Sequence, residues 1–230
     1  MRIALIGYGK MGHMIASLAQ QRGHIITCAI DSQAASLTGE QTPFPILLPE
    51  IGWDSEAFRS AEVAIEFSTP ATAEQNIRHA WQANLPVVCG TTGWDAATLM
   101  AEGLRTGHCL VWKSNFSVGV NLFFEMNNHL ATDMALLPQY TPAVSETHHI
   151  HKLDKPSGTA KTIAEGIAQQ LKRDVTQIPI ESIRQGEVPG IHTVTWDSPE
   201  DTIVITHIAK GRQGFALGAI IEAEKIINQN

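Results

Sequence analysis

The feature that most constrains the fold is a glycine-rich turn between a short apolar run and a helical pattern near the start of the chain. Residues 3–6 form the apolar run, GYGKMG follows at residues 7–12, and the helical pattern ends at Gly23. A second apolar run at residues 25–30 then leads into Asp31. This order of strand, GxGxxG, helix, strand and acid is typical of dinucleotide-binding Rossmann folds.

The residue types in this motif have distinct expected tasks. Gly7 permits a tight turn, Gly9 lets the backbone approach a pyrophosphate, and Gly12 allows the helix to pack closely on the strand. Asp31 stands where an acid hydrogen-bonds the adenosine ribose. The two residues after it are uncharged, and the lack of an arginine to meet a 2′-phosphate favours NADH over NADPH. A glycine-rich turn without a ligand is the weaker alternative.

Strand and helix patterns continue to alternate through the first half of the chain. Apolar runs predict strands at 63–67, 86–89 and 109–112, with helices at 71–84 and 95–104. Residues 32–60 are broken up by prolines, and no regular element is predicted there. The alternation predicts an α/β domain with a Rossmann-type, doubly wound parallel sheet.

Ligands of such sheets bind beyond the carboxyl ends of the strands. Three loops stand at these positions, although the second, taken alone, fits a simple turn equally well. NADH or NADPH is therefore expected to contact the following residues: Gly7, Tyr8, Gly9, Lys10, Met11, Gly12 and Asp31, then Gly90, Thr91 and Thr92, then Lys113, Ser114, Asn115 and Phe116.

The second half of the chain has a different pattern. A long apolar helix is predicted at 118–137, followed by a strand at 140–150, a helix at 159–173 and strand-like runs at 180–184, 191–196 and 202–209. The last two runs are rich in β-branched residues and flank a turn at 197–201, so they are expected to pair as antiparallel strands. A second, α+β domain with a mixed or antiparallel sheet is thus expected at 117–211.

The closing helix, at 215–227, is expected to pack back on the first domain through its largest apolar residues: Leu217, Ile220, Ile221 and Ile227. The predicted domains are therefore a dinucleotide-binding domain at 1–116 and 212–230, and a substrate-binding and oligomerisation domain at 117–211.

Composition excludes several classes of partner. The chain has 230 residues and a formal net charge of −7, so no basic surface is expected to attract nucleic acid or anionic lipid. The apolar run at the N-terminus is too short for a signal peptide, and none is long enough to span a membrane. Cys28, Cys89 and Cys109 are odd in number and each lies in an apolar run. Buried reduced thiols and a cytoplasmic location are expected.

The chemistry is concentrated in one stretch, ETHHIHKLDKPSGTAK at residues 146–161. Three histidines and a lysine lie within five residues ahead of a Pro-Ser-Gly-Thr turn that opens the helix, and Ser157 or Thr159 can cap it. The free N–H groups of the first helical turn form a ready anion site. A carboxylate held there, with proton donors beside it, is the favoured arrangement.

The histidines of this stretch admit three interpretations. A metal site is disfavoured, because adjacent histidines on a strand point in opposite directions and no CxxC or HExxH spacing accompanies them. A solvated structural face is the default for any histidine. Acid–base chemistry is favoured because a reduction that adds hydride to one carbon must also protonate the neighbouring atom. His148 and Lys152 are the candidate proton donors.

The stretch ETHHIHKLDKPSGTA resembles the E-x-HHxxKxDxPSGTA signature of the 4-hydroxy-tetrahydrodipicolinate (dihydrodipicolinate) reductase family. Further similar segments follow in the family's order and cover nearly the whole chain: GYGKMG, IEFSTP, CGTTGW, SNFSVGVN, IRQGEVPGIHTV and a Gly211-Arg212 turn. The resemblance implies NAD(P)H-dependent reduction of a cyclic dicarboxylate to tetrahydrodipicolinate in lysine and diaminopimelate biosynthesis. It also implies a homotetramer paired through the sheet of the second domain.

The resemblance assigns roles to individual residues. His148 would donate a proton and Lys152 would be a second catalytic cation. The substrate-binding residues would be His149, Ser157, Gly158 and Thr159, and Arg212 would join the cofactor-binding residues. Arg184 and Lys155 are further cations for a dicarboxylate.

Three departures from the family pattern are present. GYGKMG is one residue shorter than the first glycine loop of many members, and the region 32–60 is compact; both concern the adenosine side of the cofactor site. Lys113 stands where small residues are common, and it could add a contact or block one. Two rival functions share the first domain: a related Rossmann dehydrogenase acting on another amino-acid intermediate, and a non-catalytic dinucleotide sensor. Neither needs the HHxxKxDxPSGT residues, which are all present here.

Overall fold

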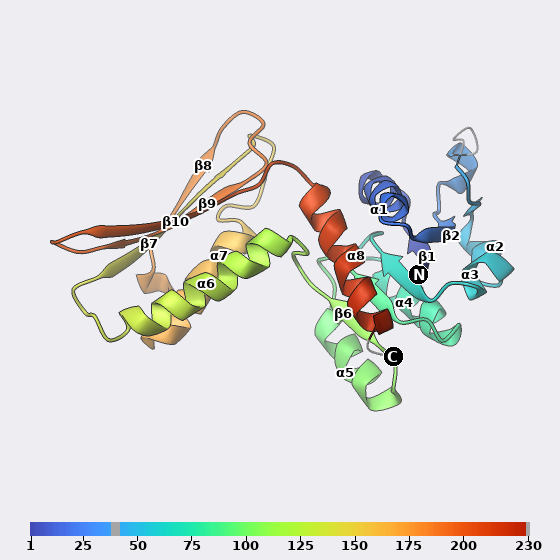
Figure 1. The fold of residues 1–230 in the computed structure, drawn as a ribbon, viewed down its shortest axis with the longest axis horizontal. Coiled ribbons are helices and arrows are strands. Elements are labelled where there is room, and N and C mark those ends of the chain that lie inside the picture. Colours follow the sequence, from blue (N-terminus) through green and yellow to red (C-terminus); the bar gives the residue numbers. More distant parts are fainter. Residues whose placement is uncertain (38–41, 229–230) are drawn as a thin grey trace. The chain divides into compact units, whose positions relative to one another are not determined.

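The computed structural model describes residues 1–37 and 42–228, and these form two compact units (Figure 1). The first unit is Met1–Phe116 together with the C-terminal segment from Phe215, and the second is Ser117–Gly214. Residues 212–214, which were predicted to join the first domain, belong to the second unit. Residues 38–41 and 229–230, included in the predicted first domain, lie outside the described part.

The first unit is built on a six-stranded sheet in the order β3-β2-β1-β4-β5-β6. Every pairing in it is parallel, which confirms the predicted doubly wound sheet. The strands are β1 (Arg2–Ile6), β2 (Ile25–Ile30), β3 (Ile46–Leu47), β4 (Val63–Glu66), β5 (Val87–Cys89) and β6 (Leu110–Trp112).

Helices cover both faces of this sheet because alternate strand residues point to opposite sides. Ile3 and Leu5 pack with α1 and α8, whereas Ala4 and Ile6 pack with α3, α4 and α5. A short 3-10 helix, Ala34–Ser36, follows β2. The helices are α1 (Lys10–Gln21), α2 (Pro49–Gly52), α3 (Glu56–Arg59), α4 (Ala73–Gln82), α5 (Ala96–Thr106) and α8 (Gln213–Asn228).

Three details of the first unit differ from the prediction. The proline-rich region contains β3, which extends the sheet by pairing with the end of β2. Cys28 and Cys89 are buried, but Cys109 is exposed because it precedes β6, an edge strand. All three are free thiols.

The third difference concerns α8, whose buried face consists largely of small residues. Of the four predicted contact residues, only Ile220 is fully buried. The other buried residues of α8 are Ala216, Gly218, Ala219, Ala223 and Ile226. A Cβ at Gly218 would lie 1.7 Å from the Phe116 carbonyl oxygen. Small residues face inward because the helix lies too close to the backbone for large ones.

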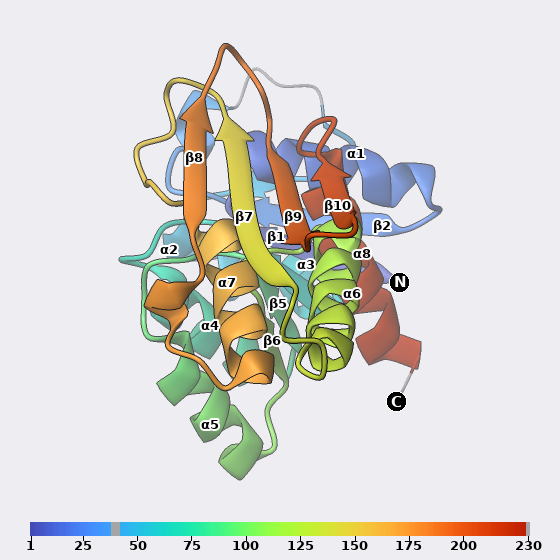
Figure 2. The ribbon, with the colours of Figure 1, turned by 90° about the vertical axis from the view of Figure 1, so that its left-hand side faces the viewer.

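The second unit is a four-stranded sheet, in the order β10-β9-β7-β8, with two helices on one face (Figures 1 and 2). β7 pairs in parallel with β8, while β9 is antiparallel to both β7 and β10. The predicted mixed sheet and the antiparallel β9–β10 pair are therefore confirmed. The elements are α6 (Val118–Met134), β7 (Thr141–His148), α7 (Gly158–Leu171), a 3-10 helix (Val175–Gln177), β8 (Ile180–Arg184), β9 (Ile191–Asp197) and β10 (Thr202–Ile208).

Burial alternates along β7 and β9, so that one face of the sheet packs on α6 and α7. Val144, Val194 and Trp196 lie in this core. The polar residues Glu146, His148 and His192 occupy alternate positions on the same strands and are buried on the same face. Among residues 1–37 and 42–228, no helix is both long and apolar enough to cross a bilayer.

Candidate active site

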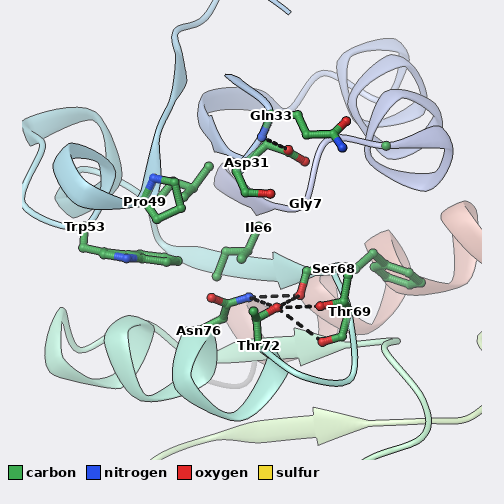
Figure 3. Close-up of a pocket in the computed structure, with 14 residues that line it drawn as sticks. Ile6, Gly7, Asp31, Gln33, Pro49, Trp53, Ser68, Thr69, Thr72 and Asn76 are labelled. Carbon is green, nitrogen blue, oxygen red and sulfur yellow. Dashed lines mark hydrogen bonds between the residues drawn. The ribbon is translucent and has the colours of Figure 1, made fainter. Parts of the chain in front are cut away.

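A pocket of about 300 Å³ lies at the carboxyl ends of β1, β2 and β4 in the first unit (Figure 3). This is the edge at which doubly wound sheets bind ligands. The pocket is lined by Ile6, Gly7, Gly9, Ile30, Asp31, Ser32, Gln33, Pro49, Trp53, Phe67, Ser68, Thr69, Thr72 and Asn76.

The three motif glycines have different surroundings. Gly7 has φ +89°, and a Cβ there would lie 2.3 Å from the Phe67 carbonyl oxygen. A Cβ at Gly12 would lie 2.4 Å from the Gly7 carbonyl oxygen, so neither position admits a side chain. At Gly9 no atom lies within 4 Å of the position that a Cβ would take. Gly9 therefore leaves open space along the backbone, which a phosphate group needs for close approach.

Asp31 is held at the pocket wall by two backbone N–H groups. Its Oδ2 accepts from Tyr8 at 2.7 Å and its Oδ1 accepts from Gln33 at 2.7 Å. Each oxygen has a second lone pair, so the carboxylate can still accept from ribose hydroxyls. Among the pocket-lining residues that the structure describes, Asp31 is the one charged side chain.

The opposite wall is a network of small polar groups that includes Ser68, Thr72 and Asn76 (Figure 3). The buried carboxylate of Glu66 lies behind it. The Ser68 hydroxyl donates to Glu66, and Asn76 donates to the Ser68 hydroxyl at 2.9 Å. The Ser68 N–H donates to the Thr91 hydroxyl at 2.9 Å, and the Cys89 thiol donates to Glu66 at 3.0 Å. This network fixes the loop after β4, which forms the wall.

The predicted cofactor residues fall into different places. Gly7, Gly9 and Asp31 line the pocket, whereas Thr91 supports it from behind through Ser68. Gly90 lies against Phe67, since a Cβ there would be 2.2 Å from that ring. The pocket also contains residues that were not predicted from the sequence. Ser68 and Thr69 follow β4 after one intervening residue, Phe67, so the rule that ligands bind beyond strand ends could have found them.

Other predicted cofactor residues lie outside the pocket lining. The side chain of Phe116 is buried in the core, and Lys113 forms an ion pair with Glu222 at 3.1 Å. Tyr8 is buried and stacks on His13. Lys10, Met11 and Gly12 form the start of α1, Thr92 and Ser114 are exposed, Asn115 is half-buried, and Arg212 is an exposed residue of the second unit.

The second unit holds a cluster of ionisable side chains at the end of β7. Glu146 is buried, and its Oε1 accepts from the Ser157 N–H at 2.9 Å and from the Arg184 guanidinium at 3.2 Å. Its Oε2 lies 3.1 Å from Nδ1 of His148, an ion-pair contact. The alternation along β7 brings Glu146 and His148 to one face, and the loop after β7 returns Ser157 to them.

Arg184 anchors this loop to β8. Besides Glu146, its guanidinium donates to the carbonyl oxygens of Lys152 at 3.2 Å and Asp154 at 2.5 Å. Arg184 was expected to be a cation for the substrate. In the structure its guanidinium instead binds the protein's own oxygens and positions the segment that carries Lys152.

The start of α7 is where an anion site was predicted. The Ser157 hydroxyl caps the helix by accepting from the Ala160 N–H at 3.2 Å. Asp154 accepts from the Gly158 N–H and lies 2.7 Å from the Lys152 ammonium. Burial opposes ionisation of Asp154, but Lys152 and Gly158 together hold the pKa of its carboxyl below the ordinary value. The structure thus brings an ammonium, a helix N-terminus and an anion together.

The remaining predicted substrate residues flank this site. His149 is half-buried, and its ring centroid lies 6.0 Å from that of His151. Gly158 is exposed and Thr159 is half-buried in the first turn of α7. His192 on β9, which was not predicted as a site residue, lies edge-on to His148 with 5.0 Å between the ring centroids. Strand alternation through Val194 and Trp196 could have placed His192 on this face.

Two family models match the chain: "Dihydrodipicolinate reductase, N-terminus" over residues 1–116 and "Dihydrodipicolinate reductase, C-terminus" over residues 119–230. Together they cover nearly every residue. The chain belongs to the dihydrodipicolinate reductase family. This family consists of NAD(P)H-dependent oxidoreductases of lysine and diaminopimelate biosynthesis.

Individual family members show the same relationship. A 4-hydroxy-tetrahydrodipicolinate reductase from Christiangramia forsetii is 41% identical, with 97% of this chain and 91% of that protein covered. A 4-hydroxy-tetrahydrodipicolinate reductase from Staphylococcus haemolyticus is 32% identical, with 100% of this chain and 96% of that protein covered.

Solved structures support the fold. A dipicolinate-bound dihydrodipicolinate reductase from Paenisporosarcina sp. TG-14 has a TM-score of 0.82 at 19% identity, covering 99% of this chain and 95% of that one. An aspartate semialdehyde dehydrogenase II from Vibrio cholerae has a TM-score of 0.59 at 11% identity, covering 99% of this chain and 98% of that one. Both likenesses concern the fold alone.

Proposed function

We propose that this chain is a 4-hydroxy-tetrahydrodipicolinate reductase, which reduces a cyclic dicarboxylate to tetrahydrodipicolinate with NAD(P)H. The proposal is supported by membership of the reductase family over both halves of the chain. The observation that carries it is the cluster at the end of β7, where His148 and Lys152 accompany the anion-binding start of α7. A non-catalytic sensor has no need of this cluster.

NAD(P)H would be held by the pocket of the first unit and would supply the hydride. The open backbone at Gly9 fits a pyrophosphate, and the anchored carboxylate of Asp31 fits the hydroxyls of a ribose. NADH is the preferred cofactor in this proposal. The described pocket lining contains a carboxylate and no cation that would attract a 2′-phosphate.

His148 donates the proton in the proposed reaction. Its imidazole, once protonated, stands beside the buried Glu146 carboxylate, which stabilises the positive charge. Lys152 supplies a second positive charge, paired in this structure with Asp154. These groups do what hydride addition requires on the protein side: they deliver a proton and neutralise an anionic substrate.

The substrate carboxylates bind at the start of α7. Ser157, Gly158 and Thr159 form its first turn, where N–H groups and the helix dipole favour anions. Asp154 accepts from the Gly158 N–H in this structure, so a substrate carboxylate competes with it for that position. His149 completes the substrate-binding residues.

The assembly in this proposal is a cytoplasmic homotetramer formed through the uncovered face of the second unit's sheet. That face is rich in threonine and β-branched residues, and three of its apolar side chains are exposed: Ile183, Val204 and Ile208. The solution mass, measured by light scattering during gel filtration, tests this. A monomer at micromolar concentration contradicts it.

The activity is tested by mixing the protein with NADH and the condensation product of pyruvate and aspartate semialdehyde. Loss of absorbance by the reduced nicotinamide, with tetrahydrodipicolinate identified by mass spectrometry, is the expected result. Tight NADH binding without turnover contradicts the proposal and favours the sensor. Turnover of another amino-acid intermediate alone favours the rival dehydrogenase.

A further inference from the structure

A row of polar side chains crosses the helix-facing side of the second unit's sheet. The strand registers place Ser182 beside Glu146, Glu146 beside His192, and His192 beside His207. Each of these four side chains has a polar atom shielded from solvent and without a well-aligned partner in the described part of the chain. Such a row is costly inside a core, and a functional task would account for its presence.

Glu146 is the one negative charge in this row. Burial opposes its ionisation, but hydrogen bonds from Ser157 and Ser182, together with the charge of a protonated His148, hold the pKa of the Glu146 carboxyl below its ordinary value. Arg184 and the Ser157 N–H both bind Oε1. Oε2 is left to face His148, whose Nδ1 is 3.1 Å away.

His148 is confined on both sides of its ring. Its Nδ1 is fully shielded from solvent and has no hydrogen-bond partner with standard geometry in the described residues, and Oε2 of Glu146 lies 3.1 Å from it. At the other nitrogen, a Cβ added to Gly190 would lie 3.1 Å from Nε2, and Gly190 has φ +155°. A larger residue at position 190 is thereby disfavoured, because its side chain would crowd Nε2 of His148.

The groups facing His148 come from every element around it. Burial is the largest influence and lowers the pKa of its imidazole, while Glu146 opposes this change. His192 on β9 is itself neutral near pH 7, because burial lowers its pKa to about 4. The charged groups facing His148 are Glu146, Lys152, Arg184 and Asp154.

The same side chains also have the spacing of a metal site. Ligand atoms of Glu146, His148 and His192 lie within 4.8 Å of one another. Arg184, however, places a fixed positive charge 3.2 Å from the same carboxylate, which opposes a second cation there. The carboxylate and the neighbouring imidazole fit the orientation of a proton donor better.

We propose that Glu146 is a positioning residue for His148: its carboxylate holds the proton on Nδ1, so that Nε2 is the nitrogen that gives up a proton to the substrate. This role rests on the proposed function of His148 as proton donor. It extends that function by naming the group that selects the imidazole tautomer, as a carboxylate does for catalytic and metal-bound histidines in general.

NMR chemical shifts of the imidazole nitrogens test the proposal without any need for turnover. His148 is assigned by the loss of its resonances in His148→Gln, and the protein is titrated as wild type and as Glu146→Gln. In the wild type the neutral ring is expected to carry its proton on Nδ1. In Glu146→Gln this preference is lost, and the titration midpoint falls by about one to three pH units because the adjacent negative charge is gone.

Several controls sharpen this titration. Glu165→Gln removes an exposed carboxylate from α7 and is expected to leave His148 unchanged. Glu146→Asp retains the charge and is expected to keep the midpoint close to that of the wild type. A neutral His148 with its proton on Nε2 in the wild type overturns the proposal even if neither Glu146 variant folds. Stoichiometric binding of added Zn²⁺ with loss of the His148 and His192 resonances also overturns it.

Turnover provides a second readout. If His148 is the acid, kcat falls as pH rises through its pKa, and Glu146→Gln moves this limb to lower pH. When the midpoint falls by one pH unit, kcat at a given pH on that limb falls about tenfold, while the Kd of NADH stays unchanged. An unchanged kcat profile with an altered NMR tautomer contradicts the role of His148 in the proposed function. An unchanged tautomer contradicts the role of Glu146 alone.

Discussion

Asp31→Asn tests the cofactor pocket most sharply, because it removes one charge while nearly preserving shape. The carboxylate of Asp31 accepts from the N–H groups of Tyr8 and Gln33, each at 2.7 Å. The amide oxygen of asparagine retains an acceptor for one of them. What is lost is the negative charge that, in the proposed function, binds the adenosine ribose.

The magnitude follows from the two interactions that change. A hydrogen bond to a charged group contributes about 1.5–3 kcal/mol, and a neutral amide recovers part of it. NADH affinity is therefore expected to fall about tenfold. A 2′-phosphate repels the wild-type carboxylate by about 1 kcal/mol at 4 Å even in bulk water. Relief of this repulsion strengthens NADPH binding about fivefold, so the NADH/NADPH preference moves about fiftyfold towards NADPH.

The assay is the quenching of protein fluorescence on titration with each reduced cofactor, followed by kcat/KM with each. The wild type is expected to prefer NADH. Glu50→Gln is a matched control, since Glu50 is an exposed carboxylate next to Pro49 and outside the described lining. Equal affinities of wild type and Asp31→Asn for both cofactors would refute the placement of the ribose at Asp31.

Three further perturbations have defined outcomes. Lys152→Ala is expected to lower kcat about a hundredfold or more with an unchanged NADH Kd; collapse of NADH binding would contradict its role. Gly218→Ala is expected to lower Tm, because the new Cβ would meet the Phe116 carbonyl oxygen at 1.7 Å and overpacking costs about 1–3 kcal/mol; an unchanged Tm would contradict this. Burial opposes ionisation of Glu224, but its contact with His24 at 2.7 Å helps to hold the pKa of that carboxyl below the ordinary value. Its stabilising effect is present above the unfolded-state pKa and is lost as pH falls through the lowered folded pKa. Glu224→Gln should therefore lower Tm at neutral pH but not at strongly acid pH, and equal losses at both would contradict the linkage.

Periodicity predicted most of the fold because each main element buries a continuous apolar face. The parallel first sheet and the antiparallel β9–β10 pair follow from runs that alternate with helices or flank a turn. β3 could not be found this way, since two residues between prolines carry no periodic signal. The predicted packing of α8 on the first unit was right for Ile220 and Ile227, but Leu217 and Ile221 are only half-buried, and small residues take most of the buried positions. Close approach to Phe116 instead selects Gly218.

The candidate site was predictable only as far as local motifs reach. The GxGxxG turn and Asp31 belong to one strand–helix–strand segment of the sequence, and Gly7, Gly9 and Asp31 all line the pocket. Trp53 and Asn76 complete the pocket from segments that only the folded sheet brings together. Glu146 and His192 likewise meet through strand register, which no single stretch of sequence encodes.

The most direct test of the account is a crystal structure with NADH and dipicolinate bound. The reduced nicotinamide is expected to face the ligand ring, with the imidazole of His148 and the ammonium of Lys152 directed at the ligand. One ligand carboxylate is expected at the N–H groups of Gly158 and Thr159. A complex in which His148 and Lys152 point away from the ligand would contradict the central claim.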